Sequence, residues 1–461
     1  MNYRAFIFFF LWTVCLFSQT ETYLLDVISD SIVIKEKRAE SFALYLPETY
    51  DTETAFPIVF IFDPGGRGKT GLAPFIKAAK KYQLIIVCSN SSRNTAYDEN
   101  FAIADRWFND VFTRFKIDQK RIYAAGFSGG ARMASAIGVI SGAFKGIVGC
   151  GAAFSGTPGQ MPYASDHFYY AGLVGNLDMN YQEMIKAGQW LNKIGLANEI
   201  ITFKGDHRWP DANDIVRAFD WFQLQDMNNG ILKENPQFLE ALLLDRVSIA
   251  RNFEQDGQLL DAASSYDNIV DDLGRYFALD SIASRSAQLK QLREYKKAVK
   301  ERDHIAKEEK AWNDKLIGKI REEIVYEEIP GDFNWWQKEL RRLKENYTES
   351  DRKSYQEMGR RIQSVIFAVA IESMQASAAG YNEKEVDYYA ALMAALWPKN
   401  PYVFFRISSS YASLGKKNEA LANLEKAIDK GWVNKQWILN SKAFRSLKGN
   451  YEFELLLKQL Q

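Results

Sequence analysis

The sequence predicts an α/β domain built on a mostly parallel sheet, followed by an all-α region. Two observations support this fold class. Between residues 57 and 204, continuously apolar segments of strand length alternate with segments of helical length, which is typical of a parallel sheet covered by helices on both faces. Beyond about residue 228 the strand-like segments stop, and the sequence becomes helical and charged. We therefore expect a leader over 1–20, an α/β domain over 21–228 and a helical domain over 229–461.

Length and charge limit the classes of partner. At 461 residues the chain is long enough for more than one hydrophobic core. Lysine and arginine together number 58, as do aspartate and glutamate, so the formal net charge is zero. A neutral chain creates no overall field that attracts nucleic acid or an anionic membrane, and we expect neither as a partner.

The N-terminus is typical of a secretion signal. Arg4 precedes an apolar run over 5–17 that only Thr13 interrupts, and a polar segment follows it. The run is short for a membrane span. Cys15 lacks the small residue that a lipoprotein signal has just before its cysteine, so we assign it to the leader. We expect a secreted or periplasmic protein that starts near 19–21 and has no membrane span after signal removal.

The elements of the α/β domain follow one another in a regular order. Residues 23–46 alternate between apolar and polar, which predicts an antiparallel meander at the start. The expected strands of the parallel part cover 57–63, 84–89, 122–125, 146–154, 168–175 and 199–204. The expected helices cover 72–82, 101–115, 131–140, 181–194 and 211–222.

The segment RIYAAGFSGG, Arg121–Gly130, has the pattern of a nucleophile elbow. A short apolar strand over 122–125 runs into Gly126, Ser128 and Gly130, and a helix-like segment follows at once. In such an elbow the serine sits on a strained turn above the sheet, and small neighbours let strand and helix approach closely. A Gly-rich turn without chemistry is the alternative, which the position between strand and helix disfavours. Ser128 is therefore the candidate nucleophile.

A serine nucleophile needs a base, and the chain has three histidines. His304 lies in the charged helical region and is most simply a solvated position. His167 just precedes a strand, where a surface or core role is the simpler interpretation. His207 follows the last expected strand and precedes the last helix, which is where the order Ser–Asp–His requires the base. We expect His207 to be the base.

The acid that orients the base should follow the penultimate strand. Asp178 is in that loop, although an aspartate there could simply cap the next helix. Asp206 and Asp211 are alternatives. Asp206 is the chain neighbour of His207 and would have difficulty reaching its far ring nitrogen. Asp178 is the preferred candidate.

A tetrahedral intermediate needs two N–H donors for its oxyanion. Gly129, the residue after the candidate nucleophile, should supply one. The other should come from the Gly-rich loop after the strand over 57–63, where Gly66 is preferred and Gly65 is second. The same loop, GGRGKT, does not have the spacing of a phosphate-binding loop.

The segments RIYAAGFSGGARMA, GNLDMNYQEM and GDHRWPD resemble those of one family. Residues 40–225 are similar to the α/β-hydrolase superfamily, in particular to secreted polyhydroxybutyrate depolymerases and feruloyl esterases, with relatives among the dienelactone hydrolases. The resemblance implies an α/β-hydrolase sheet without a large cap, a triad of Ser128, Asp178 and His207, and no cofactor or metal. Where this family usually has a His-Gly loop, the sequence has DPGG. The resemblance therefore does not identify the donors of the oxyanion hole.

The resemblance also bears on the two cysteines beyond the leader. In the family's sheet order, the strands that hold Cys88 and Cys150 are separated by two others, at about 4.8 Å per step. A disulfide tolerates less than about 7 Å between Cα atoms, so we expect the two thiols to stay unbridged.

The helical region carries weak internal repeats. Small and aromatic residues recur at similar offsets in Phe253–Tyr266 and Tyr411–Ala427, and Gly380 stands 35 residues before Gly415. This period is close to that of tetratricopeptide repeats. We expect degenerate repeats of that kind, best over 401–432, that could bind a protein partner. An irregular helical domain is the alternative. The charged stretch 286–345 predicts long solvent-facing helices.

Three functions compete at this point. The leading one is hydrolysis of a small-molecule or polymer ester. A non-catalytic scaffold is the second, and a complete Ser–Asp–His set argues against it. A serine peptidase is the third, but the usual cap position, between 154 and 168, holds only a short connection. Since no candidate lies beyond residue 228, the sequence predicts that a fragment ending near Gln225 still hydrolyses a small ester.

Overall fold

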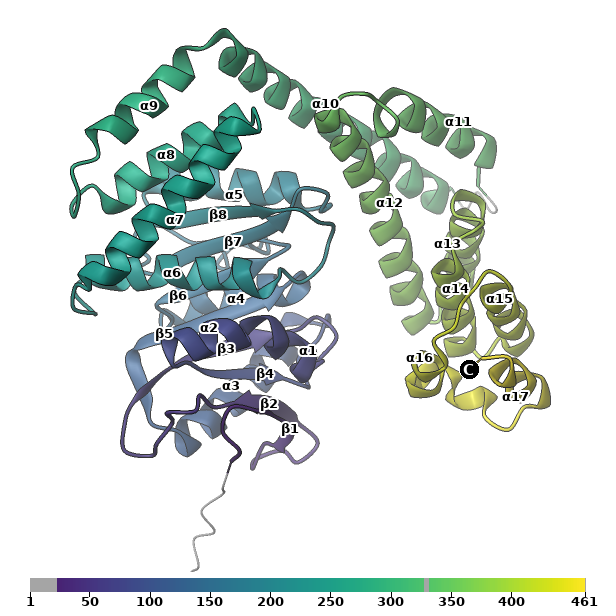
Figure 1. The fold of residues 1–461 in the computed structure, drawn as a ribbon. Coiled ribbons are helices and arrows are strands. Elements are labelled where there is room, and N and C mark those ends of the chain that lie inside the picture. Colours follow the sequence, from purple (N-terminus) through teal and green to yellow (C-terminus); the bar gives the residue numbers. More distant parts are fainter. Residues whose placement is uncertain (1–22, 327–330, 461) are drawn as a thin grey trace, which may run out of the picture.

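The computed structural model describes residues 23–326 and 331–460. The predicted leader over 1–20, with Cys15, lies outside the described residues. Within them the chain forms one eight-stranded sheet in the order β1-β2-β4-β3-β5-β6-β7-β8 (Figure 1). The strands are β1 Ile28–Val33, β2 Ser41–Tyr45, β3 Phe56–Phe62, β4 Ile85–Ser89, β5 Ile117–Phe127, β6 Gly146–Cys150, β7 Tyr169–Gly175 and β8 Asn198–Phe203.

The sheet is mixed, with an antiparallel edge and a parallel centre. β1 pairs with β2, and β2 with β4, in antiparallel fashion, whereas the pairings from β4 through β3 and β5 to β8 are parallel. All residues of β3, β4, β6 and β7 are buried. Their continuous apolar sequences follow from this burial, because helices cover both faces.

Helices of the α/β domain cover the two faces of the sheet in two sets. Their bounds are α1 Gly68–Leu72, α2 Ile76–Tyr82, α3 Tyr97–Arg114, α4 Gly129–Ser141, α5 Tyr181–Ile194 and α6 Ala212–Asn228, with a 3₁₀ turn, η1 Ala73–Phe75. One core contains residues of α3, α4 and α5, and the other contains residues of α1, α2 and α6. The expected helix over 72–82 is thus interrupted near Ala73-Pro74, because proline has no N–H for a helix interior.

The sequence misplaced the ends of two strands, since it limited one strand to 122–125 whereas β5 covers Ile117–Phe127. It also extended the strand over 146–154, but β6 ends at Cys150. The strand ends there because Gly151 has φ +67°, a left-handed conformation that does not continue a strand.

Cys88 and Cys150 are buried and free. They lie on β4 and β6, and β3 and β5 separate these two strands in the sheet. The prediction that they stay unbridged is confirmed.

The helical region forms two units with separate cores. The first packs on α6 and consists of α7 Pro236–Gln255, α8 Leu259–Leu273 and α9 Asp280–Gln291; Leu224 and Met227 of α6 belong to its core. The second begins with the long helix α10 Arg293–Val325, which runs from α9 across to a separate lobe (Figure 1). The remaining elements are α11 Phe333–Leu343, η2 Lys344–Thr348, α12 Lys353–Ala379, α13 Glu383–Leu396, α14 Pro401–Ser413, α15 Lys417–Asp429, α16 Lys435–Asn440, η3 Lys442–Leu447 and α17 Tyr451–Lys458.

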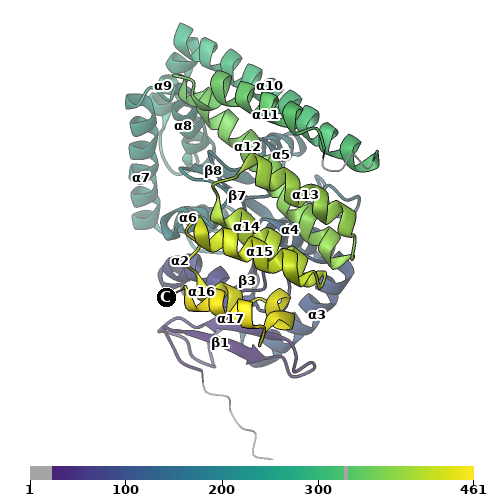
Figure 2. The ribbon, with the colours of Figure 1, turned by 90° about the vertical axis from the view of Figure 1, so that its right-hand side faces the viewer.

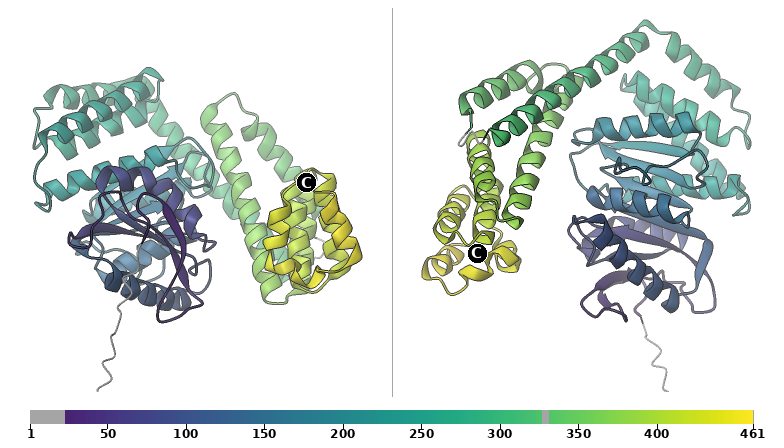
Figure 3. Two further views of the ribbon diagram at one scale, coloured as in Figure 1. Left: turned by 60° about the horizontal axis from the view of Figure 1, so that its bottom comes forward. Right: turned by 180° about the vertical axis from the view of Figure 1, so that it is seen from behind.

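This second unit, which we call the C-terminal lobe (residues 293–460 as described), stands beside the α/β domain. Figure 1 shows it next to the sheet, Figure 2 shows α12–α15 in front of the strands, and Figure 3 shows α10 bridging the two parts. The stretch 286–345 is not simply solvent-facing, because α10 buries Ile305, Trp312 and Leu316 in the core of this lobe. Residues 401–432 form the antiparallel pair α14 and α15, while their kinship to tetratricopeptide repeats stays a prediction.

Helix α12 is the central helix of the C-terminal lobe. By length and composition it is the one helix among the described residues that is long and apolar enough to cross a membrane. Its apolar residues Met358, Ile362, Ile366 and Met374 are fully buried in the lobe's core. The same helix carries charged residues that contact the α/β domain, as described below.

Candidate active site

The nucleophile elbow is a strained turn between β5 and α4. Ser128 has φ 53° and ψ −121°, which costs a residue with a side chain about 1–3 kcal/mol and is typical of functional turns. Its N–H donates to the Cys150 carbonyl at 2.8 Å. A Cβ on Gly126 would lie 2.2 Å from the Gly130 carbonyl oxygen, and one on Gly130 would lie 2.0 Å from the Phe62 carbonyl oxygen. Strand and helix can therefore meet only if both positions are glycine.

The structure brings Ser128, His207 and Asp178 together from three loops at the carboxyl ends of the strands. Nε2 of His207 lies 2.9 Å from Oγ of Ser128, and Nδ1 lies 2.9 Å from each carboxylate oxygen of Asp178. Asp178 is fully buried and also accepts the N–H of Asn180 at 2.8 Å. A buried carboxylate at Nδ1 favours the tautomer that leaves Nε2 free to accept the serine proton.

Gly151 makes room for this arrangement, and sequence reasoning missed it. A Cβ at this position would lie 2.8 Å from the Phe127 ring, 3.2 Å from Oδ2 of Asp178 and 3.2 Å from Cε1 of His207. The Phe127 and His207 rings themselves lie 4.6 Å apart between centroids. The glycine directly after β6 was the available signal, but it lay inside a predicted strand.

Asp63, at the end of β3, was also missed. Its buried carboxylate accepts bonds from Nε of Arg67 at 2.9 Å and from Nε1 of Trp209 at 3.1 Å. Trp209 packs on Phe127, with ring centroids 5.3 Å apart. Asp63 thus ties the Gly-rich loop to the loop that carries His207.

The expected oxyanion donors differ in their surroundings. Gly129 begins α4, where a helix leaves the N–H without an intrahelical acceptor. The N–H of Gly66, in contrast, donates to the Asp63 carbonyl at 3.0 Å, and that of Gly65 donates to the Asp63 carboxylate at 2.9 Å. In this conformation neither predicted second donor is available, because the aspartate of DPGG closes a turn over them.

Asn94 lies where a second donor would be useful. A Cβ on Gly129 would lie 2.0 Å from Oδ1 and 3.1 Å from Nδ2 of Asn94, so its amide group is directly beside the elbow. The backbone N–H of Asn94 donates to the Pro64 carbonyl at 2.9 Å, which fixes this loop against the Gly-rich one. Nothing in its sequence context singled this asparagine out.

Ser128 opens into a cavity of about 500 Å³ that both parts of the molecule line. The α/β domain contributes Asn94, Tyr97, Ser128, Arg132 and Met179, among others. Helix α12 contributes Val365, Ala368, Val369 and Glu372. The loop between Phe154 and Phe168 is short, as expected, but the cavity has a wall that the sequence assigned to a separate domain.

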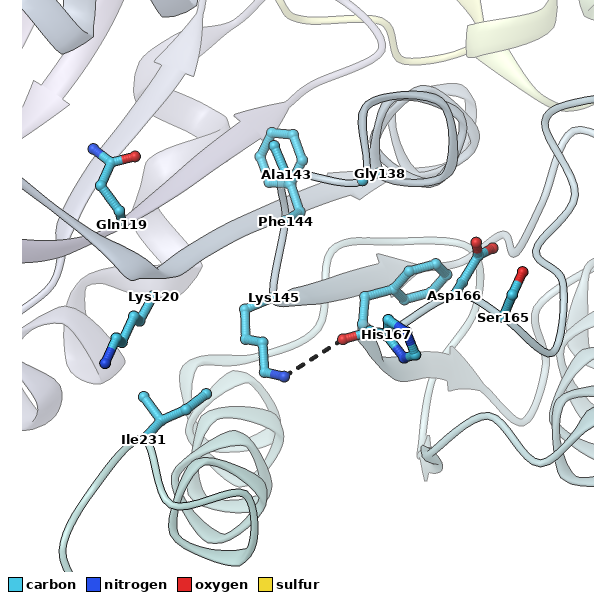
Figure 4. A pocket seen from close by; sticks show the side chains of 12 residues that line it. Gln119, Lys120, Gly138, Ala143, Phe144, Lys145, Ser165, Asp166, His167 and Ile231 are labelled. Carbon is cyan, nitrogen blue, oxygen red and sulfur yellow. Dashed lines mark hydrogen bonds between the residues drawn. The ribbon is translucent and has the colours of Figure 1, made fainter.

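The competing residues lie elsewhere. His167 precedes β7 and borders a second cavity at the amino ends of the strands, together with Lys120 and Lys145 (Figure 4). His304 lies on α10, 6.3 Å from the Tyr355 ring. Asp211 caps α6 through the N–H groups of residues 213 and 214, and Asp206 is an exposed partner of Arg208.

Comparisons with known proteins give structural matches at low identity. No family model matches the sequence, and no curated protein matches it. An S-formylglutathione hydrolase from Staphylococcus aureus is 15% identical, with 44% of this chain and 98% of that chain covered and a TM-score of 0.36. An esterase from Pyrobaculum calidifontis is 14% identical, with 42% and 82% covered and a TM-score of 0.34. Est1E from Butyrivibrio proteoclasticus is 11% identical, with 43% and 100% covered and a TM-score of 0.35.

Proposed function

We propose that this protein is a serine hydrolase that cleaves carboxylic esters through an acyl-enzyme on Ser128. The observation that carries the proposal is the chain of contacts from Ser128 through His207 to the buried Asp178, each of 2.9 Å, on a strained elbow beside a cavity. A serine hydroxyl becomes a nucleophile when an oriented imidazole takes its proton.

The geometry supports two half-reactions. In the first, Nε2 of His207 takes the Ser128 proton while Oγ attacks the ester carbonyl, and the same proton then passes to the departing alcohol. In the second, His207 takes a proton from water, the resulting hydroxide attacks the acyl group, and the proton returns to Oγ of Ser128. Asp178 holds the imidazole and stabilises its charged form in both halves.

The oxyanion that forms in each half-reaction needs preorganised donors. We assign one to the N–H of Gly129 and the other to the side-chain amide of Asn94, in place of Gly66. Asparagine side chains serve this role in other hydrolases, and removal of one such donor costs about 10²–10³ in kcat. Nδ2 of Asn94 is close to Gly129, since it lies 3.1 Å from the position that a Cβ on that glycine would take.

A scaffold without activity does not need a strained serine and a fully buried carboxylate in contact with one histidine. A serine peptidase would use the same three residues. We favour esters, and we further propose export of the protein, which N-terminal sequencing of the mature chain from a cell fraction would test.

The test is hydrolysis of a panel of nitrophenyl, feruloyl and acetyl-sugar esters, alongside aminoacyl nitroanilides. We expect turnover of at least one ester, its loss in Ser128→Ala, and full retention in Ser141→Ala, which changes an exposed serine at the end of α4. Turnover of nitroanilides alone would make the protein a peptidase. Unchanged hydrolysis in Ser128→Ala would overturn the proposal.

A further inference from the structure

We infer that the C-terminal lobe is part of the catalytic apparatus, because Arg361 of α12 is a positioning residue for the loops that carry Asp178 and His207. The inference rests on the proposed function of these two residues and adds a third group that acts through them. The helix is distant in the chain, because Arg361 lies 185 residues after Asn176 of the acid loop.

Arg361 and Glu309 form a buried ion pair at the boundary between the lobe and the α/β domain. They are 3% and 2% exposed. Nε of Arg361 donates to one carboxylate oxygen of Glu309 at 2.8 Å, and Nη2 donates to the other at 2.7 Å. This two-point contact between α12 and α10 fixes the plane of the guanidinium, which a lysine could not do.

The third donor of the same guanidinium reaches the acid loop. Nη1 of Arg361 donates to the Asn176 carbonyl at 2.9 Å, two residues before Asp178. The guanidinium also lies over the Tyr181 ring, 4.8 Å from its centroid, on the other side of Asp178. Gln182 adds a bond from its side chain to Glu309 at 3.0 Å. The lobe therefore holds the loop of the candidate acid at both of its ends.

Asn176 passes this restraint on to the base loop. Its side-chain Nδ2 donates to Glu357 of α12 at 2.7 Å, while its Oδ1 accepts the N–H of Gly205 at 3.0 Å. The next N–H, of Leu177, donates to the Gly205 carbonyl at 2.9 Å. Gly205 stands two residues before His207. The chain of contacts from Arg361 and Glu357 through Asn176 thus reaches both loops whose separation sets the Asp178–His207 contact.

These contacts would matter for turnover because small displacements of the candidate triad would lower the rate. A shift of about 1 Å in a catalytic group can cost about 10² in rate. The same helix also supplies Val365, Ala368 and Val369 to the wall of the cavity, so substrate binding and triad geometry depend on one element.

The molecule offers a matched control at its other boundary. Arg246 of α7 donates to Glu199 of β8 at 2.9 Å and to Asp272 of α8 at 2.6 Å, and it is also mostly buried. This ion pair fastens the first helical unit to the sheet without contact to either loop of the triad. Substitution of either arginine should therefore lower the free energy of unfolding. Only substitution of Arg361 should also lower turnover.

The experiment compares Arg361→Lys and Arg246→Lys in the full chain, with kcat and KM for a short nitrophenyl ester and the rate of fluorophosphonate labelling. We expect kcat and the labelling rate to fall at least about tenfold in Arg361→Lys with KM within about twofold, and both to stay within twofold in Arg246→Lys. A double variant, Arg361→Leu with Glu309→Leu, removes the buried charges together, so it should fold while its kcat stays low.

Three results would decide the matter. Normal kcat in both Arg361 variants would overturn the inference and leave the proposed function intact. Equal losses in the Arg361→Lys and Arg246→Lys proteins would also overturn it, since the effect would then be structural. A wild-type protein that neither hydrolyses the ester nor reacts with the fluorophosphonate would instead overturn the proposed function.

Discussion

The helical region contacts the α/β domain in two places. One contact fixes a helical unit against the sheet, and the other fixes a loop of the candidate active site. The unit α7–α9 follows the α/β domain directly in the chain, yet its Arg246 binds Glu199 at the start of β8, the opposite end from the loop that carries His207. The C-terminal lobe contacts the acid loop through Arg361 and Glu357 and lines the cavity at Ser128. Distance along the chain is therefore a poor guide to which part of this protein contacts the candidate active site.

The largest effect should come from the elbow itself. Because the members of a triad act as a unit, Ser128→Ala and His207→Ala should each lower kcat by about 10⁴–10⁶, as measured with an activated ester. His167→Ala, at the opposite end of the strands, should keep most of the activity. Comparable losses in His167→Ala and His207→Ala would remove the reason for placing the chemistry at the carboxyl edge of the sheet.

Gly151→Ala should come next, because the added methyl group would press on both Phe127 and His207. We expect activity to fall about 10²-fold, through displacement of the imidazole. Gly195→Ala is the matched control: this residue has φ +75° but open space around it. Both variants should lose about 1–2 kcal/mol of unfolding free energy through backbone strain, and only Gly151→Ala should lose activity. Full activity in Gly151→Ala would show that the site tolerates such a displacement.

Asn94→Ala should have an intermediate effect. If the Asn94 amide binds the oxyanion, kcat should fall by about 10²–10³ with little change in KM, because the bond forms only in the transition state. Thr95→Ala changes a neighbouring residue that lines the same cavity, and it should retain activity. A kcat for Asn94→Ala within twofold of the wild type would contradict the assignment of Asn94 and favour a second donor in the Gly-rich loop.

The smallest effect on activity should come from Asp226, on the side where α7–α9 pack. Burial raises the pKa of Asp226 to about 6, although its Oδ2 accepts a bond from the Tyr123 hydroxyl at 2.6 Å. The folded state therefore binds a proton more tightly than the unfolded state, whose pKa is near 3.8, and stability falls as pH rises from about 4 through about 6.

Asp226→Asn removes this dependence. Compared with the wild type it should gain about 1–3 kcal/mol of unfolding free energy at pH 8, and the gain should shrink toward pH 4, with kcat unchanged. Chemical denaturation at both pH values measures this, with the exposed Asp256→Asn as a control. A gain that is the same at pH 4 and pH 8 would contradict the assigned titration.

The α/β part of the fold could be predicted from the sequence because its signals are local. Continuous apolar segments mark the buried strands, and β3, β4 and β7 lie within one residue of the predicted bounds at each end. Gly126, Ser128 and Gly130 marked the elbow, since only glycine permits those close approaches. His207 and Asp178 followed from chain order once the strands were placed.

The remaining features depend on contacts between distant segments. In the sequence, Asp63 is a strand-end aspartate like several others. Only its contacts with Trp209 and Arg67 in the fold distinguish it. The turn it closes occupies the N–H groups of Gly65 and Gly66, which the sequence offered as oxyanion donors. Arg361 lies in a helix whose sequence indicates only amphipathic packing, so its contact with Asn176 has no local signal. For the same reason, a fragment ending near Gln225 now carries the opposite expectation: without Glu357 and Arg361 it should hydrolyse a small ester poorly.

If Ser128 forms the covalent intermediate, a reagent that traps serine nucleophiles should attach to Ser128. The full-length protein is treated with a fluorophosphonate, digested, and its peptides are sequenced by mass spectrometry. We expect one adduct per chain, located on Ser128, and none when His207→Ala is treated in the same way, because His207 activates this nucleophile. A protein that remains unlabelled, or an adduct on a different serine, would contradict it.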